Sequence, residues 1–266
     1  DDEYFQKKLM NKFIQSMDDQ AKFMSENLSI FGQTNNFLIS ELVSLKFINH
    51  IFPFIDYKYD LDKVLIEELD KQICEDGTSF ENSTGYQRFV TELLVILSFL
   101  SKNDADRYDI YTQYLNGLIQ SLANLSTSSG YMPHIGDVSL ERAYWFETEM
   151  DVFNISDLIS ISSVLTKNNS LKNLSTSCCS SLFWMLGMKG VELFNQMKSE
   201  STECKLNIYP YGGLGSMRSS NLNRDISHIS FDCGEIGLNN QGGHGHNDFG
   251  SFSFSFNNQP IIIDRG

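Results

Sequence analysis

The sequence has few basic residues, and it lacks the cysteine pattern and the long apolar run that mark several common protein classes. Its 20 lysines and arginines are outnumbered by 34 acidic residues, which gives a formal net charge of −14. Such a surface repels nucleic acid and anionic membranes, so an anionic ligand must be held by local groups. The five cysteines form no C-x-x-C pair, which indicates neither a disulfide framework nor a structural zinc site. The longest apolar run, at 93–100, is shorter than the roughly 20 residues of a membrane span.

The residues that are present favour a helical N-terminal part with a large core. Hydrophobic residues make up 41% of the chain, which is enough for one large or two ordinary domains. Up to about residue 200 the apolar residues recur at helical spacing, as in Leu38, Leu42 and Leu45. Polar and glycine-containing breaks are predicted near 31–34, 76–85, 101–106, 126–137 and 166–175. The short connections predict stacked helical hairpins.

Strands are predicted after Pro210, in the segments 211–218, 226–233, 251–256 and 259–264. Phe252, Phe254 and Phe256 alternate with serines, which puts the aromatic side chains on one face and the serines on the other, as expected of a sheet with one buried face. A β-sandwich is the expected context. Because about four strands are fewer than a closed sandwich normally uses, we expect the sequence to end within that domain.

The strongest candidate for chemistry is the run Gly242-Gly-His-Gly-His-Asn-Asp248, just before a predicted strand. Its glycines let the backbone approach a ligand, and its two histidines are suited to proton transfer or metal binding. The alternative is a glycine-rich connection with solvated histidines. Asp264 ends an apolar strand, where a carboxylate needs a partner or a metal, and a hairpin would bring it to His246.

Two weaker candidates lie in the helical part. A turn-rich loop at 75–85 leads to Tyr86, and Ser83 or Thr84 can cap the helix that carries it. On this segment alone, a packing residue with its hydroxyl at the surface is the better explanation of Tyr86. The segment Gln33-Thr-Asn-Asn-Phe37 precedes another helix, and one of its polar residues can serve as an N-cap.

Taken together, these segments resemble the heparinase II/III superfamily of polysaccharide lyases. In the family's order, the most specific segments are Gly212-Gly-Leu-Gly-Ser-Met-Arg218, Phe231-Asp-Cys-Gly-Glu-Ile-Gly237, Gly243-His-Gly-His-Asn-Asp248 and Gln259-Pro-Ile-Ile-Ile-Asp264. Two segments of the helical part also resemble the family, the loop that bears Tyr86 and Pro133-His-Ile-Gly-Asp137. The family's Asn-Asn-His signature is present as Asn35-Asn36-Phe37, so the histidine is replaced.

The resemblance implies a fold and a location. The fold class is α+β multidomain, with an incomplete (α/α) toroid of helical hairpins at 1–203 followed by the first strands of an antiparallel β-sandwich at 204–266. The chain is then a fragment that lacks the C-terminal part of the sandwich. A periplasmic or exported, cell-envelope location is implied as well.

The resemblance also implies β-elimination on an acidic, uronic-acid-containing polysaccharide. Asn36 would bind the uronate carboxylate, Tyr86 would act as general acid and in some substrates also as base, and His244 would be the base in the others. Four further residues would bind the substrate, namely Asn35, Gln87, His134 and Asn247. His246 and Asp264 would hold a structural metal, zinc, with a third ligand from elsewhere.

Two functions other than a lyase are also compatible with the sequence. The first is a catalytically weakened glycan-binding or polysaccharide-biosynthesis-associated protein with the same fold, which the replacement at Phe37 and the scarcity of basic residues favour. The second is a glycosidase on a similar toroid, which needs two facing carboxylates. The carboxylates available for it are Glu81, Glu92, Asp137 and Glu141.

Overall fold

The computed structural model describes residues 2–53, 57–138, 140–146, 151–175, 180–198, 204–220, 226–247 and 249–264. The chain forms two compact units, residues 1–71 and 72–266. The predicted domain boundary at 203/204 stays a prediction.

The first unit consists of three helices. They are α1 (Asp2–Glu26), α2 (Asn36–Ile51) and α3 (Leu61–Gln72), whose last residue belongs to the second unit. The core of this unit is aliphatic and includes Leu38, Leu42, Leu45 and Leu65. The helical periodicity of the sequence is confirmed here, but the end of α2 at Ile51 and the start of α3 at Leu61 were not predicted.

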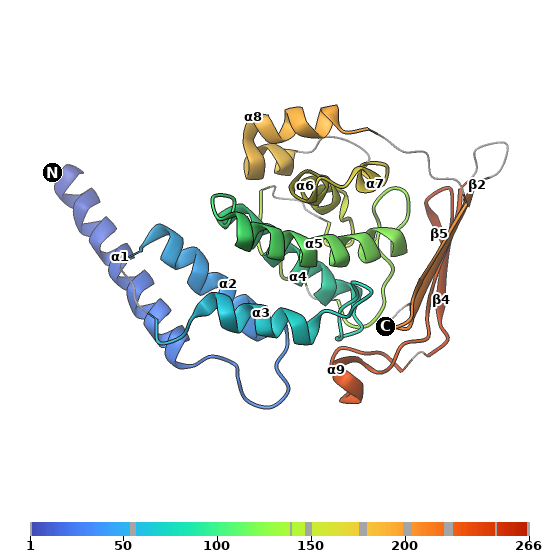
Figure 1. Cartoon of the computed structure of the whole chain (residues 1–266), viewed down its shortest axis with the longest axis horizontal. Helices are drawn as coiled ribbons and strands as arrows, with labels where there is room; N and C mark the ends of the chain where they lie inside the picture. The colour runs from blue at the N-terminus through green and yellow to red at the C-terminus, as the bar shows by residue number, and fades with distance from the viewer. Residues whose placement is uncertain are drawn as a thin grey trace. The chain divides into compact units, whose positions relative to one another are not determined.

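The second unit begins with helices that pack as hairpins. They are α4 (Thr84–Leu100), α5 (Ala105–Leu125), α6 (Ser156–Thr166), the short α7 (Asn169–Lys172) and α8 (Ser180–Gln196). Figure 1 shows α4 and α5 side by side, with α6 and α8 stacked next to them. Between α5 and α6 the chain forms no helix from 126 to 155 in its described part, so this connection is longer than the predicted break at 126–137.

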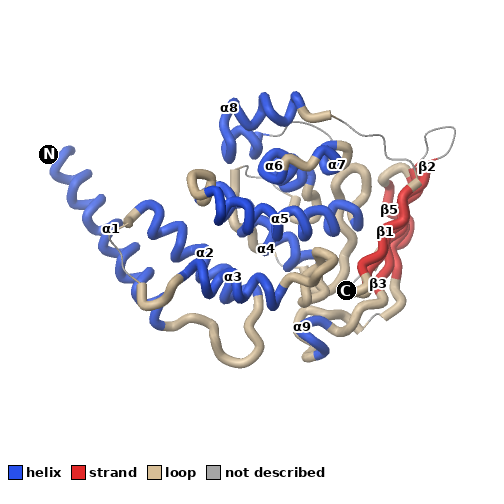
Figure 2. The backbone as a smooth tube through the Cα atoms, in the orientation of Figure 1, coloured by secondary structure: helices blue, strands red, loops and turns tan. Residues whose placement is uncertain are grey.

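The second unit ends in an antiparallel sheet with the strand order β1-β2-β3-β4-β5. The strands are β1 (Lys205–Tyr209), β2 (Leu214–Ser220), β3 (Ile226–Asp232), β4 (Phe252–Phe256) and β5 (Gln259–Ile262), and the short helix α9 (Gly237–Asn240) lies between β3 and β4. Figure 2 shows the strands beside the end of α5. Helical hairpins followed by an antiparallel sheet are therefore confirmed, and β1 is the strand that was not predicted.

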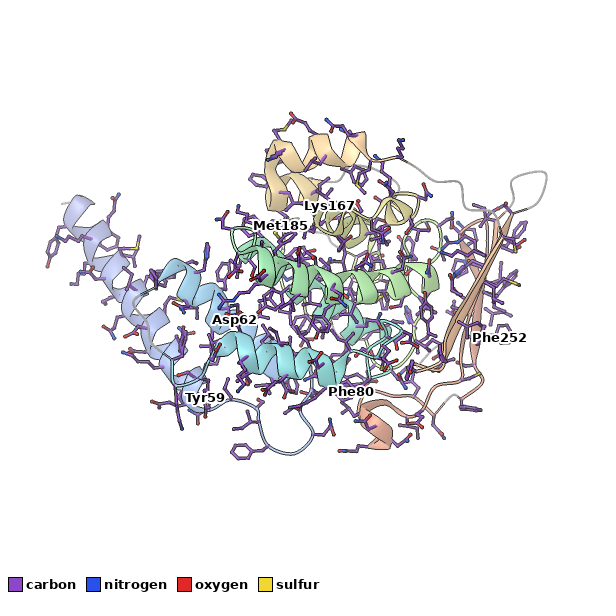
Figure 3. All side chains as sticks on the ribbon, in the orientation of Figure 1. Tyr59, Asp62, Phe80, Lys167, Met185 and Phe252 are labelled. Atoms are coloured by element: carbon purple, nitrogen blue, oxygen red, sulfur yellow. The ribbon has the colours of Figure 1, made fainter. Side chains whose placement is uncertain are left out.

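The two faces of β4 differ in burial, as expected, and the serine face is the more buried one at Ser255. Ser255 is only 6% exposed, whereas Phe252 is 46% and Phe256 is 41% exposed. Figure 3 shows Phe252 on the side of the sheet away from the helices. Through the strand register, Ser253 and Ser255 share their face with Ser216 and Arg218 of β2, and these two β2 residues contact the end of α5.

Polar side chains of the inner sheet face bind the last carbonyls of α5, which have no partner within the helix. The Ser216 hydroxyl donates to the Asn124 carbonyl at 2.8 Å, and Arg218 Nη2 donates to the Ser126 carbonyl at 2.6 Å. His228 Nε2 lies 3.4 Å from the same Asn124 oxygen. Burial, and secondarily Arg218, lower the pKa of His228 to about 4, so the imidazole is neutral at this contact.

An apolar cluster completes the contact between helices and sheet. It is formed by Leu125, Ile135, Tyr209 and Leu214. Within the described ranges, no helix has the length and apolar character needed to span a membrane.

Candidate functional site

The loop that precedes Tyr86 is tied to the connections between strands. The Asp76 carboxylate accepts hydrogen bonds from the amides of Tyr211, at 2.8 Å, and Gly212, at 3.3 Å. The Asn82 side chain donates to the Glu235 carbonyl at 2.6 Å. These bonds join segments far apart in the sequence and fix the entry to α4.

Ser83 caps α4 and places Tyr86 in its first turn. The Tyr86 amide donates to Ser83 Oγ at 3.1 Å, and the same hydroxyl donates to the Asp137 carbonyl at 2.6 Å. The cap predicted at Ser83 or Thr84 is therefore confirmed at Ser83. It links the tyrosine helix to the loop that carries Asp137.

The histidine loop packs on the Asp137 loop through a glycine. The Asp137 amide donates to the His244 carbonyl at 2.8 Å. Gly136 has a positive φ of 66°, and a Cβ at this position would lie 2.5 Å from the His244 oxygen and 2.8 Å from the Asn82 oxygen. Only glycine allows three loops to approach this closely.

The three loops bring Tyr86 and His244 together between two carboxylates. The ring centroids of Tyr86 and His244 are 3.8 Å apart, with the planes tilted by 35°. His244 Nε2 lies 3.8 Å from Glu81 Oε2, and His244 Nδ1 lies 3.6 Å from Asp137 Oδ2. The other Asp137 oxygen lies 3.4 Å from His246 Nε2, so Asp137 bridges the two histidines.

The surroundings of Tyr86 keep its phenol protonated. Partial burial raises its pKa, and the negative charges of Glu141, Asp137 and Glu81 raise it further. The opposite shift would be needed for a phenolate base at neutral pH. The arrangement is chemically suited to a phenol that donates a proton and a neighbouring imidazole that accepts one.

The β4–β5 hairpin brings His246 and Asp264 together, with Nδ1 and Oδ2 3.3 Å apart. This distance is compatible with two ligands of one tetrahedral zinc ion, for which about 3.4 Å is expected from bond lengths near 2.1 Å. Over the described ranges, however, no three histidine, cysteine or acidic side chains form a metal-binding group. A closed zinc site does not fit these residues alone.

The remaining predicted site residues have different environments. In the first unit, Asn35 is the N-cap of α2, because its side chain accepts from the Phe37 amide at 3.1 Å. Asn36 follows with 1% exposure, whereas the Phe37 side chain is 58% exposed. In the second unit, Asn247 is exposed at the surface.

Gln87 lies inside the second unit rather than at its surface. It is 2% exposed, and its amide nitrogen donates to the Leu118 carbonyl, at 3.0 Å, and to Ser121 Oγ, at 2.7 Å. Its oxygen accepts from the Ser79 amide at 3.2 Å. This side chain braces the loop before Tyr86 against α5 and has no contact with the site surface.

His134 lies at a cavity of about 530 Å³ in the second unit. Its ring stacks on Phe153 with a centroid distance of 4.0 Å. Burial lowers its pKa, although the nearby Asp264 acts in the opposite direction. The serine face of the sheet forms another wall of the cavity, through Ser230, Ser253 and Ser255.

Two residues beside the histidine were not assigned a place at this site from the sequence. Asp137 belongs to the Pro133–Asp137 motif, and Glu81 precedes Tyr86, so both lay in segments that resembled the family.

The carboxylates considered for a glycosidase include one that is fully buried. Glu92 is 0% exposed and is bound by Arg88 and Arg142. It is therefore unavailable to a substrate.

Comparisons with known proteins agree with this architecture. The crystal structure of heparinase III aligns with 97% of this chain and 38% of its own, at a TM-score of 0.65 and 14% identity. The heparan sulfate lyase HepC from Pedobacter heparinus aligns with 96% of this chain and 36% of its own, at a TM-score of 0.59 and 18% identity. The chain thus spans little more than a third of these structures. At such identities the likeness concerns the fold, and it confirms the predicted class of toroid hairpins followed by sandwich strands. A comparison with curated proteins gave no match.

The family comparison covers both parts of the sequence. Residues 1–158 match the heparinase II/III N-terminus, and residues 205–266 match the heparinase II/III-like C-terminal domain. The first match alone spans more than half of the chain, and the two occur in the order of the helical part and the sheet. The chain therefore belongs to the heparinase II/III family.

Proposed function

We propose that this chain is part of a polysaccharide lyase that cleaves a uronic-acid-containing glycan by β-elimination. The observation that carries the proposal is the contact between the Tyr86 and His244 rings, 3.8 Å apart, between two carboxylates. The family supports the reaction class, and the names of the matched structures, heparinase III and heparan sulfate lyase, make heparan sulfate the first substrate to test.

In the proposed reaction His244 removes the proton at C5 of the uronate. The electron pair of that bond forms the double bond between C4 and C5, and the bond from C4 to the leaving oxygen breaks. Tyr86 donates its phenolic proton to this oxygen, and proton exchange with solvent then restores both groups. The raised pKa of Tyr86 favours the acid role, which leaves the role of base to His244.

Glu81 and Asp137 orient His244 in this scheme. The two carboxylates lie at opposite ring nitrogens of the imidazole, with Glu81 Oε2 3.8 Å from Nε2 and Asp137 Oδ2 3.6 Å from Nδ1. Asn36 would donate hydrogen bonds to the uronate carboxylate and stabilise the charge that grows in the transition state. Only with a third ligand from elsewhere would His246 and Asp264 hold zinc, as a structural ion that fixes this loop, and no step of the reaction depends on it.

Absorbance of the unsaturated product tests the proposal directly. The full-length protein is incubated with heparan sulfate, hyaluronan, chondroitin, alginate and bacterial capsular polysaccharides, and ultraviolet absorbance is followed. A rise is expected with one of these substrates, and Tyr86→Phe should abolish it because the variant keeps the ring but loses the transferable proton. Tyr108→Phe, near the start of α5 where the hydroxyl donates to the Leu165 carbonyl, is the matched control and should keep the rate. A rate unchanged by Tyr86→Phe would contradict the proposed acid.

A glycan-binding protein with weakened activity is the second candidate, and Phe37 is the observation that favours it. Its exposed ring stands where the family signature has a histidine that binds the substrate carboxylate, next to Asn36. Phe37→His should raise the lyase rate if carboxylate neutralisation limits the reaction. Glycan binding without product, in both the natural chain and this variant, would favour the binding protein.

A further inference from the structure

A buried ionic cluster lies along α4, starting two residues after Tyr86. Arg88 Nη1 donates to Glu92 Oε1 at 2.8 Å, and Arg142 Nε donates to the same oxygen at 3.1 Å. The side chains of Arg88 and Glu92 are 0% exposed, and that of Arg142 is 1% exposed. We refer to Arg88, Glu92 and Arg142 as the Arg–Glu–Arg cluster.

The cluster binds the backbone of segment 140–146 at consecutive residues. Arg88 Nη2 donates to the Glu141 carbonyl at 2.7 Å. The second carboxylate oxygen of Glu92 accepts from the Ala143 amide at 2.8 Å. Together with the Arg142 side chain, three successive residues are held on one face of α4, although the segment forms no helix or strand of its own.

Stability alone is a weak explanation for such a cluster. The cost of removing charges from water largely cancels their attraction, so apolar residues of similar volume often stabilise a core equally well or better. What apolar residues cannot do is fix a loop backbone, because they offer no hydrogen bonds to its carbonyl and amide groups. The distinctive effect of the cluster is therefore geometric.

The segment held in this way is adjacent to the site. It carries Glu141, and it follows the loop with Asp137, two of the three carboxylates whose charge acts on the Tyr86 phenol. Tyr86 is in the first turn of α4, and Arg88 and Glu92 follow on the same helix. One rigid helix thus holds both the phenol and the groups that anchor its charged neighbours.

We propose that Arg88, Glu92 and Arg142 are positioning residues that set the geometry of the Tyr86 site by anchoring segment 140–146 to α4. This inference rests on the proposed function, because it assigns the cluster a role in that reaction. None of the three residues touches the substrate in this role. They act through the placement of the Glu141 carboxylate near the phenol.

The test compares Arg142→Lys and Glu92→Gln with Arg107→Lys, which alters an exposed ion pair with Asp104 on α5. Lysine cannot reproduce the planar contact of the guanidinium, and glutamine removes the shared charge. Both cluster variants should lower kcat by about 10- to 100-fold, because small misplacements near the reacting groups have effects of this size. KM should change less than twofold, and Arg107→Lys should leave both constants unchanged.

A second readout separates positioning from general destabilisation. Displacing Glu141 from the phenol removes a charge that raises its pKa, so the basic limb of the kcat profile should move to lower pH in the folded cluster variants. Arg142→Met leaves the Arg88–Glu92 pair intact and provides a folded variant if Glu92→Gln does not fold. Circular dichroism and thermal unfolding establish which variants are folded.

The outcomes are distinct for the two proposals. Suppose the natural protein is active and the folded cluster variants keep both its kcat and the basic limb of its pH profile. This result would overturn the positioning role but not the lyase proposal. If the natural protein releases no product from any glycan, the lyase proposal fails. In that case the placement of Glu141 near the phenol is tested without activity, by titrating 3-fluorotyrosine at position 86 with fluorine NMR. If the pKa of this residue is the same with Arg142 and with Arg142→Lys, the anchoring of Glu141 is overturned.

Discussion

Acidification is expected to weaken the contact between the sheet and the end of α5, because His228 is buried there in its neutral form. Its ring is 4% exposed, and its folded-state pKa is about 4 compared with an ordinary value of 6.5. The folded state therefore binds fewer protons than the unfolded state between these values. The contribution of His228 to stability is present above pH 6.5 and is lost as the pH falls toward 4.

The size of the effect follows from the two pKa values. Linkage gives a loss of about 2 kcal/mol between pH 7 and pH 5 and about 3 kcal/mol by pH 4 for this one group. His228→Gln removes the titration, and its amide can still donate to the Asn124 carbonyl. Because other groups also titrate in this range, the quantity to compare is the difference between the natural protein and the variant.

Denaturant unfolding at pH 7 and pH 5, followed by circular dichroism, measures this difference. The free energy of unfolding of the natural protein should fall by about 2 kcal/mol more than that of His228→Gln over the interval. Parallel losses in the two proteins would refute the reasoning. In that case the imidazole is either hydrated or already protonated at the contact with α5.

Three further effects are expected. Lyase activity should decline as the pH rises above 10, since the raised pKa of Tyr86 keeps the acid protonated up to that range; a pH profile of kcat with no basic limb would contradict the assignment. Gly136→Ala should destabilise the protein by roughly 1–3 kcal/mol in thermal unfolding, because its Cβ would lie 2.5 Å from the His244 oxygen at a positive φ, and an unchanged melting temperature would mean that the loops can separate. Asp264→Ala should lower the zinc content measured by mass spectrometry, whereas Tyr86→Phe should not, and equal zinc in both variants would exclude Asp264 as a ligand.

Several features of the fold and the site could be predicted from the sequence because they depend on residues close together in the chain. The spacing of Leu38, Leu42 and Leu45 predicted α2, and the hydroxyl of Ser83 before Tyr86 predicted the cap of α4. The alternation at 251–256 likewise predicted β4. Capping and side-chain period are local properties, so the local sequence is sufficient to determine them.

The candidate site was predicted only in part. The family resemblance identified Tyr86, His244 and His246, and the structure places the first two in ring contact. The resemblance did not identify Asp137 as the residue between the two histidines, and it did not predict that Gln87 is buried. A resemblance names residues within a motif, whereas the partners of a side chain depend on which loops meet.

Tertiary structure decided the features that depend on distant segments. A side-chain period of two put Phe252 and Ser255 on opposite faces, but only the packing of the helical part and its connections against the sheet made the serine face the more buried one. The irregular segment 140–146 has no periodicity to predict. Its placement depends on a hydrogen bond that Arg88 donates to it and one that Glu92 accepts from it, and both residues lie about 50 positions earlier in the chain. Local sequence patterns were sufficient for most of the helices and strands and for the chemical groups available, whereas long-range packing determined which of those groups meet, because a local pattern contains no information on what will cover it.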